Sequence, residues 1–472
     1  MPNPQWSVAL TLSLLAAPLP FAALSVSTSA QTTGANAART PLATIPDHYS
    51  PPAGGWMPRC NATLTTCAYI AQQDGKSMVV RNEKADAAYD EVKDVVFSQD
   101  GAHIAYAARR GTAWLVVADG KEGSTFDTID NLMFRGTVPI YVGSRPPAPR
   151  PQAGQFGGSS DVAGFRNPRK AGAQAVMMVG DREDEIPVVE DRFLGIKDLR
   201  VSPDGKIYAY IIQMSASAYG LWLLTVNGEQ IAEDHGITMF SFLRDGRMAF
   251  ARRTGSAVLG QSRVQIGNVE NQEAETIVGD IVAGAVTPDG QHTAYVSCVG
   301  KDPRTPPGKA DGQCALRLDG KVVREGAVSR PALSPTGATL AYAEKHADGQ
   351  SSAMVGNQAG PPVDAVTSDI LFSANGRRHA YHATLGGKAV VIVDGTPGPA
   401  FDTMSGLRFS ADSRHVAYSA TRDGLHQIVV DQVAGPTTYA WTTAPVFDAA
   451  ATAVQFVAQD GRSFFRQTVR VR

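Results

Sequence analysis

The stretch "LRFSADSRHVAYSATRDG", Leu407–Gly424, decides the fold because its pattern returns throughout the chain. Its first part, "LRFS", alternates apolar and polar residues, which is typical of a strand with one buried face. The polar segment "ADSR" favours a tight turn, since Asp side chains bond to their own backbone. The part "HVAYSA" predicts a second strand, antiparallel to the first, that carries an Ala-Tyr pair.

The same unit recurs with Pro, Asn, Asp or Gly in its turn. "VVFSQDGAHIAYAA" begins at Val95, "LRVSPDGKIYAYII" at Leu199 and "ILFSANGRRHAYHA" at Ile370. In the Ser-Pro-Asp-Gly variant, Pro fixes φ at the second turn position and Gly accepts a positive φ. An aromatic residue anchors the second strand of each unit. The anchors are Tyr69, Tyr106, Tyr141, Tyr210, Phe250, Tyr295, Tyr342, Tyr381, Tyr418 and Phe456.

Two further strands complete each unit. A third, β-branched run ends in a hairpin signal such as "VVADG" at Val116 or "VVIVDG" at Val390. Asp-Gly favours the two-residue turns that match strand twist. A more polar fourth run follows, such as "AFDTM" at Ala400. Repetition of four short antiparallel strands predicts an all-β fold, a β-propeller of four-stranded antiparallel blades.

The repeat "SPDGK…YAY" at Ser202 resembles the WD-like repeats of the TolB and tricorn type of β-propeller. This resemblance runs from about Arg59 to the C-terminus, and it implies an architecture without implying a catalytic residue. Propellers usually have about 4–8 blades, fewer than the anchors present here. We predict about 7–10 repeats in one closed array. Two packed rings, or a smaller ring with atypical end copies, are the alternatives.

The chain divides into three predicted segments. Residues 1–30 read as a signal peptide, because an almost wholly apolar run leads to a small-residue segment ending at Ala30. Residues 31–58, rich in Ala, Thr, Pro and Gly, are expected to form a linker. Residues 59–472 are expected to form the propeller, with a long loop insertion at 144–172. The mature protein is therefore expected to be periplasmic or secreted, without a transmembrane segment.

Recurrent histidines and aspartates have structural explanations. His103, His292 and His415 each lie three residues before an anchor, where other copies have Ile207 or Arg378. We interpret this as a tolerant strand position, and predict no metal site. The recurrent aspartates are interpreted as turn formers. They are Asp100, Asp204, Asp245, Asp289 and Asp412.

The sequence contains no motif of a known catalytic machinery. The Gly-x-Ser-x-Gly elbow of hydrolases and the Cys-x-x-Cys and His-Glu-x-x-His zinc patterns are absent. We therefore predict no catalytic residue and no cofactor. The formal net charge of −2 gives no indication of a nucleic-acid partner.

The four cysteines predict two local disulfides. Cys60 takes the inner-strand position of its repeat, and Cys67 lies across the predicted hairpin. Cys298 ends a second strand, and Cys314 begins the third strand of the same unit. An even number of cysteines in an exported chain favours the pairs Cys60–Cys67 and Cys298–Cys314 over a metal site.

The best indication of function is where the insertions occur. They lie between the second and third strands, at Ser144 to about Gly172, Ser215–Gly220 and Lys301–Gln313, and all should emerge on one face of the ring. The longest insertion is basic and holds two phenylalanines. The predicted binding residues are Arg145, Arg150, Phe156, Phe165, Arg166, Arg169 and Lys170.

These observations favour an exported, non-enzymatic scaffold. We expect it to bind a protein or acidic macromolecular partner in the cell envelope through its long-loop face. The alternative is a propeller enzyme or a carbohydrate-binding protein with its site in the central channel. A structure distinguishes the two by the residues that line that channel.

Overall fold

The computed structural model describes residues 37–145, 174–186, 196–214, 221–234, 236–254, 261–267, 269–270, 277–278, 280–299 and 313–471. The chain divides into two units, Met1–Asn36 and Ala37–Arg472, and all described residues belong to the second. The predicted signal peptide lies outside the described residues. Within the described part of the chain, no helix is long and apolar enough to span a membrane.

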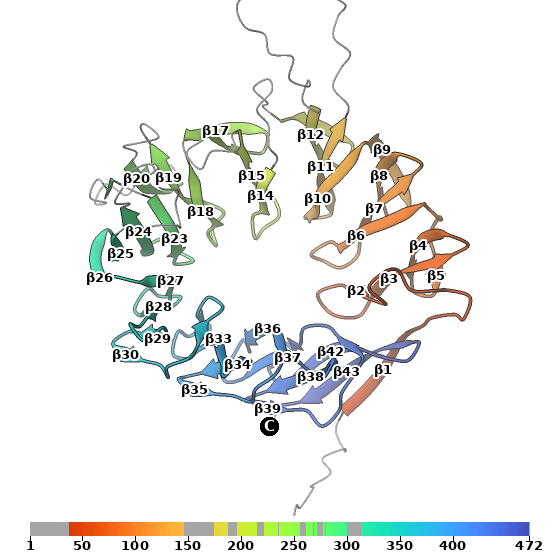
Figure 1. Cartoon of the computed structure of the whole chain (residues 1–472). Coiled ribbons are helices and arrows are strands. Elements are labelled where there is room, and N and C mark those ends of the chain that lie inside the picture. The colour runs from red at the N-terminus through yellow and green to blue at the C-terminus, as the bar shows by residue number, and fades with distance from the viewer. Residues whose placement is uncertain are drawn as a thin grey trace, which may run out of the picture. The chain divides into compact units, whose positions relative to one another are not determined.

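The described residues form ten antiparallel sheets, which are the blades of a ten-bladed β-propeller (Figure 1). Blade 1 has β2 (Arg59–Cys60), β3 (Cys67–Gln73), β4 (Lys76–Arg81) and β5 (Lys84–Ala85). Blade 2 has β6 (Glu91–Phe97), β7 (Ile104–Arg110), β8 (Ala113–Ala118) and β9 (Lys121–Phe126). Blade 3 has β10 (Thr128–Arg135), β11 (Val138–Arg145), β12 (Gln174–Val179) and β13 (Arg182–Glu185). Blade 4 has β14 (Ile196–Val201), β15 (Tyr208–Gln213), β16 (Trp222–Val226) and β17 (Glu229–Asp234).

The remaining blades follow the same order from the channel outward. Blade 5 has β18 (Ile237–Phe242), β19 (Met248–Thr254), β20 (Gln261–Ile266), β21 (Val269–Glu270) and β22 (Ile277–Val278). Blade 6 has β23 (Asp280–Val286), β24 (Thr293–Val299), β25 (Gln313–Leu318) and β26 (Lys321–Glu325), and blade 7 has β27 (Val328–Leu333), β28 (Leu340–Lys345), β29 (Ser351–Val355) and β30 (Gln358–Ala359). Blade 8 has β31 (Ala365–Val366), β32 (Leu371–Phe372), β33 (His379–Leu385), β34 (Lys388–Val393) and β35 (Thr396–Pro397). Blade 9 has β36 (Thr403–Phe409), β37 (Val416–Arg422), β38 (Leu425–Val430) and β39 (Val433–Ala434). Blade 10 has β40 (Trp441–Thr442), β41 (Val446–Phe447), β42 (Ala453–Asp460), β43 (Ser463–Arg470) and β1 (Ala37–Thr44).

Each predicted anchor lies in the second strand of its own blade and is buried. The prediction of one closed array is therefore confirmed, and the number of blades equals the number of anchors. The copies at Tyr141 and Phe456, which depart most from the repeat, also form complete blades.

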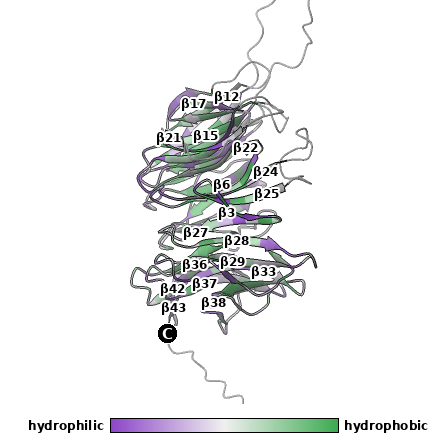
Figure 2. Ribbon diagram, turned by 90° about the vertical axis from the view of Figure 1, so that its left-hand side faces the viewer, coloured by the Kyte–Doolittle hydropathy of each residue, from purple (hydrophilic) through white to green (hydrophobic). Residues whose placement is uncertain are grey.

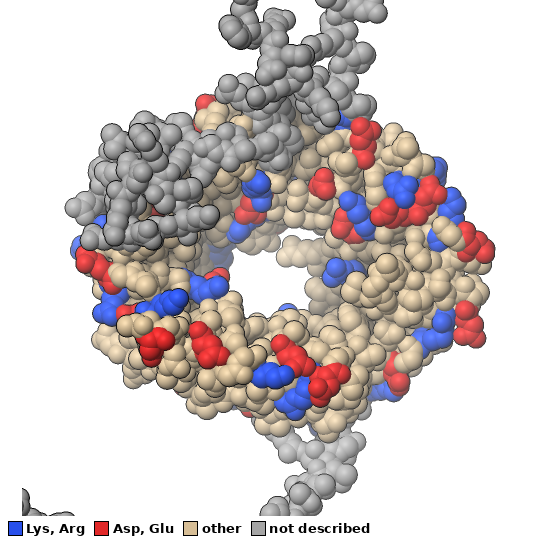
Figure 3. Space-filling model, in the orientation of Figure 1, with Lys and Arg blue, Asp and Glu red and all other residues tan. Residues whose placement is uncertain are grey.

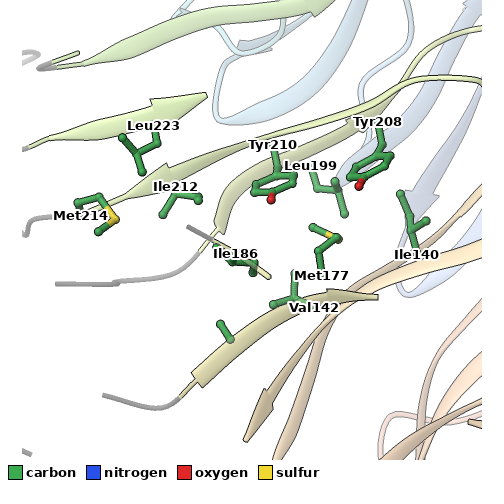
Figure 4. Packing of buried hydrophobic residues seen from close by; sticks show 11 residues of the cluster. Ile140, Val142, Met177, Ile186, Leu199, Tyr208, Tyr210, Ile212, Met214 and Leu223 are labelled. Carbon is green, nitrogen blue, oxygen red and sulfur yellow. The ribbon is translucent and has the colours of Figure 1, made fainter. Parts of the chain in front are cut away.

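The core lies between neighbouring blades. Figure 4 shows one such layer, in which Val142 and Met177 of blade 3 meet Leu199, Tyr210 and Ile212 of blade 4. Burial of a side chain of this size contributes about 1.5–3 kcal/mol. The outer strand β17, by contrast, is hydrophilic and mostly exposed (Figure 2). The blades are thus held side by side by the alternate residues of their second and third strands.

Blade 10 is built from both ends of the described chain. β1 pairs antiparallel with β43, from Ala37 opposite Val469 to Thr44 opposite Ser463. Part of the segment predicted as a linker, residues 31–58, is therefore the outermost strand of the last blade. Its sequence, "AARTPLAT", lacks a clear apolar alternation because most of the strand is exposed. Pro41 is tolerated because the register shifts there, at the edge of a sheet.

The predicted turns have the expected hydrogen bonds. Each recurrent aspartate accepts the backbone N–H of the residue two positions on, as Asp100 does from Ala102 at 3.0 Å. Ser98 Oγ in the same turn accepts the backbone N–H of His103. The interpretation of these aspartates as turn formers is confirmed.

The histidines before the anchors do more than occupy a strand position that tolerates many residue types. Their Nδ1 atoms lie 2.7–2.8 Å from a carboxylate oxygen of the aspartate that opens the turn between the third and fourth strands. The pairs are His103–Asp119, His292–Asp319 and His415–Asp431. In blade 8, Arg378 makes the equivalent contact with Asp394 at 2.8 Å. In these four blades the side chain at this position therefore joins the two turns, whereas Ile207 in blade 4 has no group that could make the contact.

Candidate functional site

The long insertions occur in successive blades. The segments 146–173, 215–220 and 300–312 follow the second strands β11, β15 and β24, as predicted, and the segment 255–260 follows β19 in the same way. The fourth was not predicted, because "GSAVLG" is short and partly apolar. All four segments lie outside the described residues, and each joins the end of a second strand to the start of a third, in blades 3 to 6.

Only one of the predicted binding residues of the long insertion belongs to the described chain. Arg145 ends β11, and its guanidinium makes two hydrogen bonds to Glu183 of β13, at 2.6 and 2.7 Å. It also lies over the Phe126 ring, 4.9 Å from its centre. Hydrogen bonding to Glu183 raises the pKa of Arg145 above its usual value. Arg150, Phe156, Phe165, Arg166, Arg169 and Lys170 lie outside the described residues.

The inner strands carry a repeated irregularity that faces the channel. In blades 2, 3, 5, 7 and 9, a β-bulge places two residues of the inner strand opposite the single anchor aromatic. The first bulge residue has a left-handed backbone: φ is 53° at Asp94, 56° at Asn131, 53° at Met239, 51° at Arg330 and 67° at Gly406. Asp, Asn and Gly tolerate this region, whereas Met and Arg seldom adopt it. Such outliers are commonest where a side chain is held for a function.

Contacts from the inner strands link neighbouring blades around the channel. Each donor lies at or next to a bulge, and each acceptor lies on the inner part of the next blade. The contacts are Lys93 Nζ to Ile129 O (3.0 Å), Thr238 Oγ1 to Ile281 O (3.1 Å) and Arg330 Nη1 to Asp369 Oδ1 (3.4 Å). The bulges therefore hold the blades in register and bring polar side chains to the channel wall.

A hollow of about 830 Å³ lies where blades 1 to 4 meet the channel. Its wall includes Arg59, Lys93, Asp94, Asp130 and Asn131. Ser144, the residue before Arg145, also lines it, so the hollow reaches the root of the long insertion. Figure 3 shows an opening through the centre of the ring, with residues of both charges at its rim. This hollow is the candidate functional site.

Three charged side chains of this region have no partner. Arg59, Asp130 and Lys197 make no ion pair and no side-chain hydrogen bond with any residue in the described ranges. By contrast, Lys93 is held by Ile129 O and lies 4.7 Å from the centre of the Trp114 ring. The candidate site therefore offers one unpaired cation, Arg59, and one unpaired carboxylate, Asp130, to a ligand, whereas Lys197 lines the neighbouring hollow.

A second hollow, of about 560 Å³, lies along the channel at blades 4 to 6 and is also lined by Asp369 of blade 8. Lys197, Met239 and Asp369 line it, together with the bare backbone at Gly284. A Cβ atom at Gly284 would lie 2.0 Å from the sulfur of Met239, so glycine is required for the bulge of blade 5 to pack on blade 6. The channel wall is thus charged at blades 1 to 4 and more apolar at blades 5 and 6.

The two predicted disulfides are confirmed. Cys60 and Cys67 face each other across β2 and β3, and Cys298 and Cys314 face each other across β24 and β25. The first holds the two-residue strand β2, and with it Arg59, against β3. Within its loop, Asn61 Oδ1 accepts the backbone N–H groups of Thr65 and Thr66. The second lies at the base of the insertion 300–312.

Sequence reasoning did not find the residues of the channel site. The bulge interrupts the apolar alternation of the inner strand twelve residues before most anchors. This interruption was the one feature of the sequence that could have indicated the channel-lining residues. The interruption was not informative by itself, because the residues at this position share no chemical property. They are Asp94, Arg330, Asp369, Gly406 and Ala444. Among the described residues, no group of three or more His, Cys, Asp or Glu could hold a metal ion.

The solved structures to which this chain is similar include β-propellers with low sequence identity to it. TolB from Acinetobacter baumannii is 14% identical with a TM-score of 0.27, over 57% of this chain and 78% of that chain. The propeller domain of the Trilobed protease from Pyrococcus furiosus is 12% identical with a TM-score of 0.32, over 59% and 95%. The Cps50 (Swd1) propeller domain of Myceliophteria thermophila is 10% identical with a TM-score of 0.28, over 59% and 99%. No family model and no curated protein matches the sequence.

Proposed function

We propose that this protein is an exported, non-enzymatic β-propeller that binds an acidic segment of a protein partner in the cell envelope. The partner would occupy the insertion-bearing end of the channel. The observation that carries this proposal is the hollow of blades 1 to 4, where Arg59 lacks a partner and which opens at the root of a basic insertion.

The charges favour an acidic ligand. Arg59 offers an unpaired cation in the hollow and Lys197 offers one in the neighbouring hollow. Residues 146–170 hold four basic residues against one acidic residue, Asp161. On a chain with a formal net charge of −2, such a local excess steers acidic partners to one end of the ring. Asp130 would accept a donor from the same partner and help to set its orientation.

The export part of the proposal rests on two features of the sequence. The first 30 residues have the pattern of a signal peptide. All four cysteines are in disulfides, which persist in oxidising compartments such as the periplasm and the cell exterior.

Site-specific crosslinking tests the proposed surface. A photoreactive amino acid is placed at position 59, and the tagged protein is illuminated with envelope extract. We expect one acidic protein to be crosslinked from position 59. The same substitution at Lys84, an exposed residue of the outer strand β5, is the control and should give no crosslink.

The charge requirement is tested by affinity measurements with the captured partner. Each exposed ion pair contributes about 0.2–1 kcal/mol, so the double variant Arg59→Ala/Lys197→Ala should bind about twofold to thirtyfold more weakly. Deletion of residues 146–170 should weaken binding while leaving the melting temperature nearly unchanged, and added salt should reproduce the loss. If both variants bind the partner as the wild type does, the surface is misassigned.

A further inference from the structure

A groove of about 450 Å³ lies at the seam where the two ends of the described chain meet. It is separate from the channel, because one wall is the outermost strand β1 and another is the link between β39 and β40. Arg39 of β1 faces Asp460, Phe465 and Gln467 of β42 and β43, and Tyr439 closes the opposite side. The wall that Arg39 forms is therefore present only when β1 pairs with β43.

The floor of the groove is aromatic and carries one free amide. Phe465 is buried, with the Tyr439 ring 5.9 Å away and the Arg39 guanidinium 3.6 Å over its centre. Gln467 is 8% exposed and lines the groove, yet its side chain makes no hydrogen bond with any residue of the described ranges. The amide atoms of Gln467 are open to the groove, so they can donate to and accept from a ligand bound there.

The charge of the groove favours a neutral ligand. Arg39 and Asp460 form an ion pair, 3.2 Å between Nη2 and Oδ2, so their charges cancel. What remains is a set of planar and hydroxyl groups: the guanidinium, the carboxylate, the Gln467 amide and the hydroxyls of Thr437 and Thr438. Such groups both donate and accept, and neighbouring hydroxyls of a sugar match them in pairs. The volume is within the range of small-molecule sites.

We propose that this groove binds a neutral saccharide. Sugar hydroxyls would accept from the Arg39 guanidinium and the Gln467 amide nitrogen, and would donate to Asp460 and the Gln467 amide oxygen. The apolar face of the sugar would lie toward Tyr439. Because the ligand contacts both β1 and β43, binding stabilises the pairing of these two strands. This site is independent of the proposed protein-binding surface.

Saturation-transfer NMR tests the proposal with three neutral probes: maltotriose, cellotriose and chitotriose, each at millimolar concentration. We expect the wild-type protein to give a signal with at least one of them. Gln467→Met, which keeps the length of the side chain and removes its amide, should weaken binding up to about tenfold, the worth of one hydrogen bond. Arg39→Met should do the same. Arg59→Ala, in the channel, should bind the saccharide like the wild type.

Hydrogen exchange provides a second readout that does not depend on the variants. The bound saccharide should slow amide exchange in residues 38–43 of β1 and leave exchange in β6 unchanged. The proposal is wrong if none of the three saccharides binds the wild-type protein. It is also wrong if Gln467→Met binds as tightly as the wild type at an equal melting temperature.

Discussion

Two kinds of buried tyrosine distinguish packing from hydrogen bonding in the blades. Tyr381 and Tyr418 are fully buried anchors, and within the described chain their hydroxyls have no hydrogen-bond partner. Tyr89 and Tyr208 are equally buried, but their hydroxyls donate to Glu122 at 2.7 Å and Asp184 at 2.6 Å. Replacing tyrosine with phenylalanine should therefore change stability in opposite directions in the two pairs.

The magnitudes follow from what each hydroxyl loses on folding. A hydrogen bond to a charged group contributes about 1.5–3 kcal/mol, so Tyr89→Phe and Tyr208→Phe should each lower the free energy of unfolding by that amount. An unpaired buried hydroxyl costs about 1–3 kcal/mol, so Tyr381→Phe and Tyr418→Phe should raise it, by about 1 kcal/mol after repacking. Phe250 and Phe456 already occupy the equivalent position in blades 5 and 10.

Guanidinium unfolding at neutral pH measures the four variants. The midpoint should move up for Tyr381→Phe and Tyr418→Phe and down for the other two, at an unchanged slope. Burial raises the pKa of Tyr381 to about 12, so its hydroxyl stays protonated throughout the assay. The reasoning is refuted if Tyr381→Phe is destabilised as much as Tyr89→Phe, since its hydroxyl would then have a partner such as a buried water.

Three further changes test other parts of the fold. Burial lowers the pKa of His382 below 6.5, so at lower pH the unfolded chain binds more protons than the folded chain, and stability should decline on acidification. The melting temperature of His382→Val should therefore change less across pH 5 to 8 than that of the wild type. A wild-type melting temperature that does not change over this range would contradict the prediction. Replacing Cys298 and Cys314 together with serine should cost about 3 kcal/mol, measured by guanidinium unfolding, and a change below about 0.5 kcal/mol would show that the loop is constrained otherwise. Deleting residues 37–44 should leave β43 as an open edge and cause self-association in size-exclusion chromatography, whereas a stable monomer would mean that β1 does not close the ring.

Much of the fold was predictable because each blade is specified locally. Turn residues, apolar alternation and the anchor lie within about 40 residues of one another, so the repeat determines its own strands. The number of anchors even equals the number of blades, although ten exceeds the usual range. What the sequence did not predict is β1, because "AARTPLAT" pairs through its backbone at an exposed edge and needs no apolar pattern.

The candidate site was less predictable because it depends on register. Arg59, Asp130 and Lys197 look like ordinary polar strand residues, and only the ring brings blades 1 to 4 around one hollow. Gln467 likewise resembles any strand glutamine until β1 places Arg39 beside it. The cysteine pairs were predictable for the opposite reason, since each joins adjacent strands of a single hairpin.

Closure through β1 makes the last blade depend on two strands that lie far apart in the sequence. Arg39 and Asp460 meet although they are 421 residues apart, whereas the other blades form from nearby segments. Each doubling of loop length costs about 0.6 kcal/mol, so this distant pairing is only about 2 kcal/mol harder to close than one blade. The consequence is one of timing, because β1 is synthesised long before β43 and stays unpaired until β43 has been made. A chain that stops before Ser463 lacks β43 and leaves two unpaired edges. It is therefore exposed to proteolysis and aggregation in a way that a chain with both β1 and β43 is not.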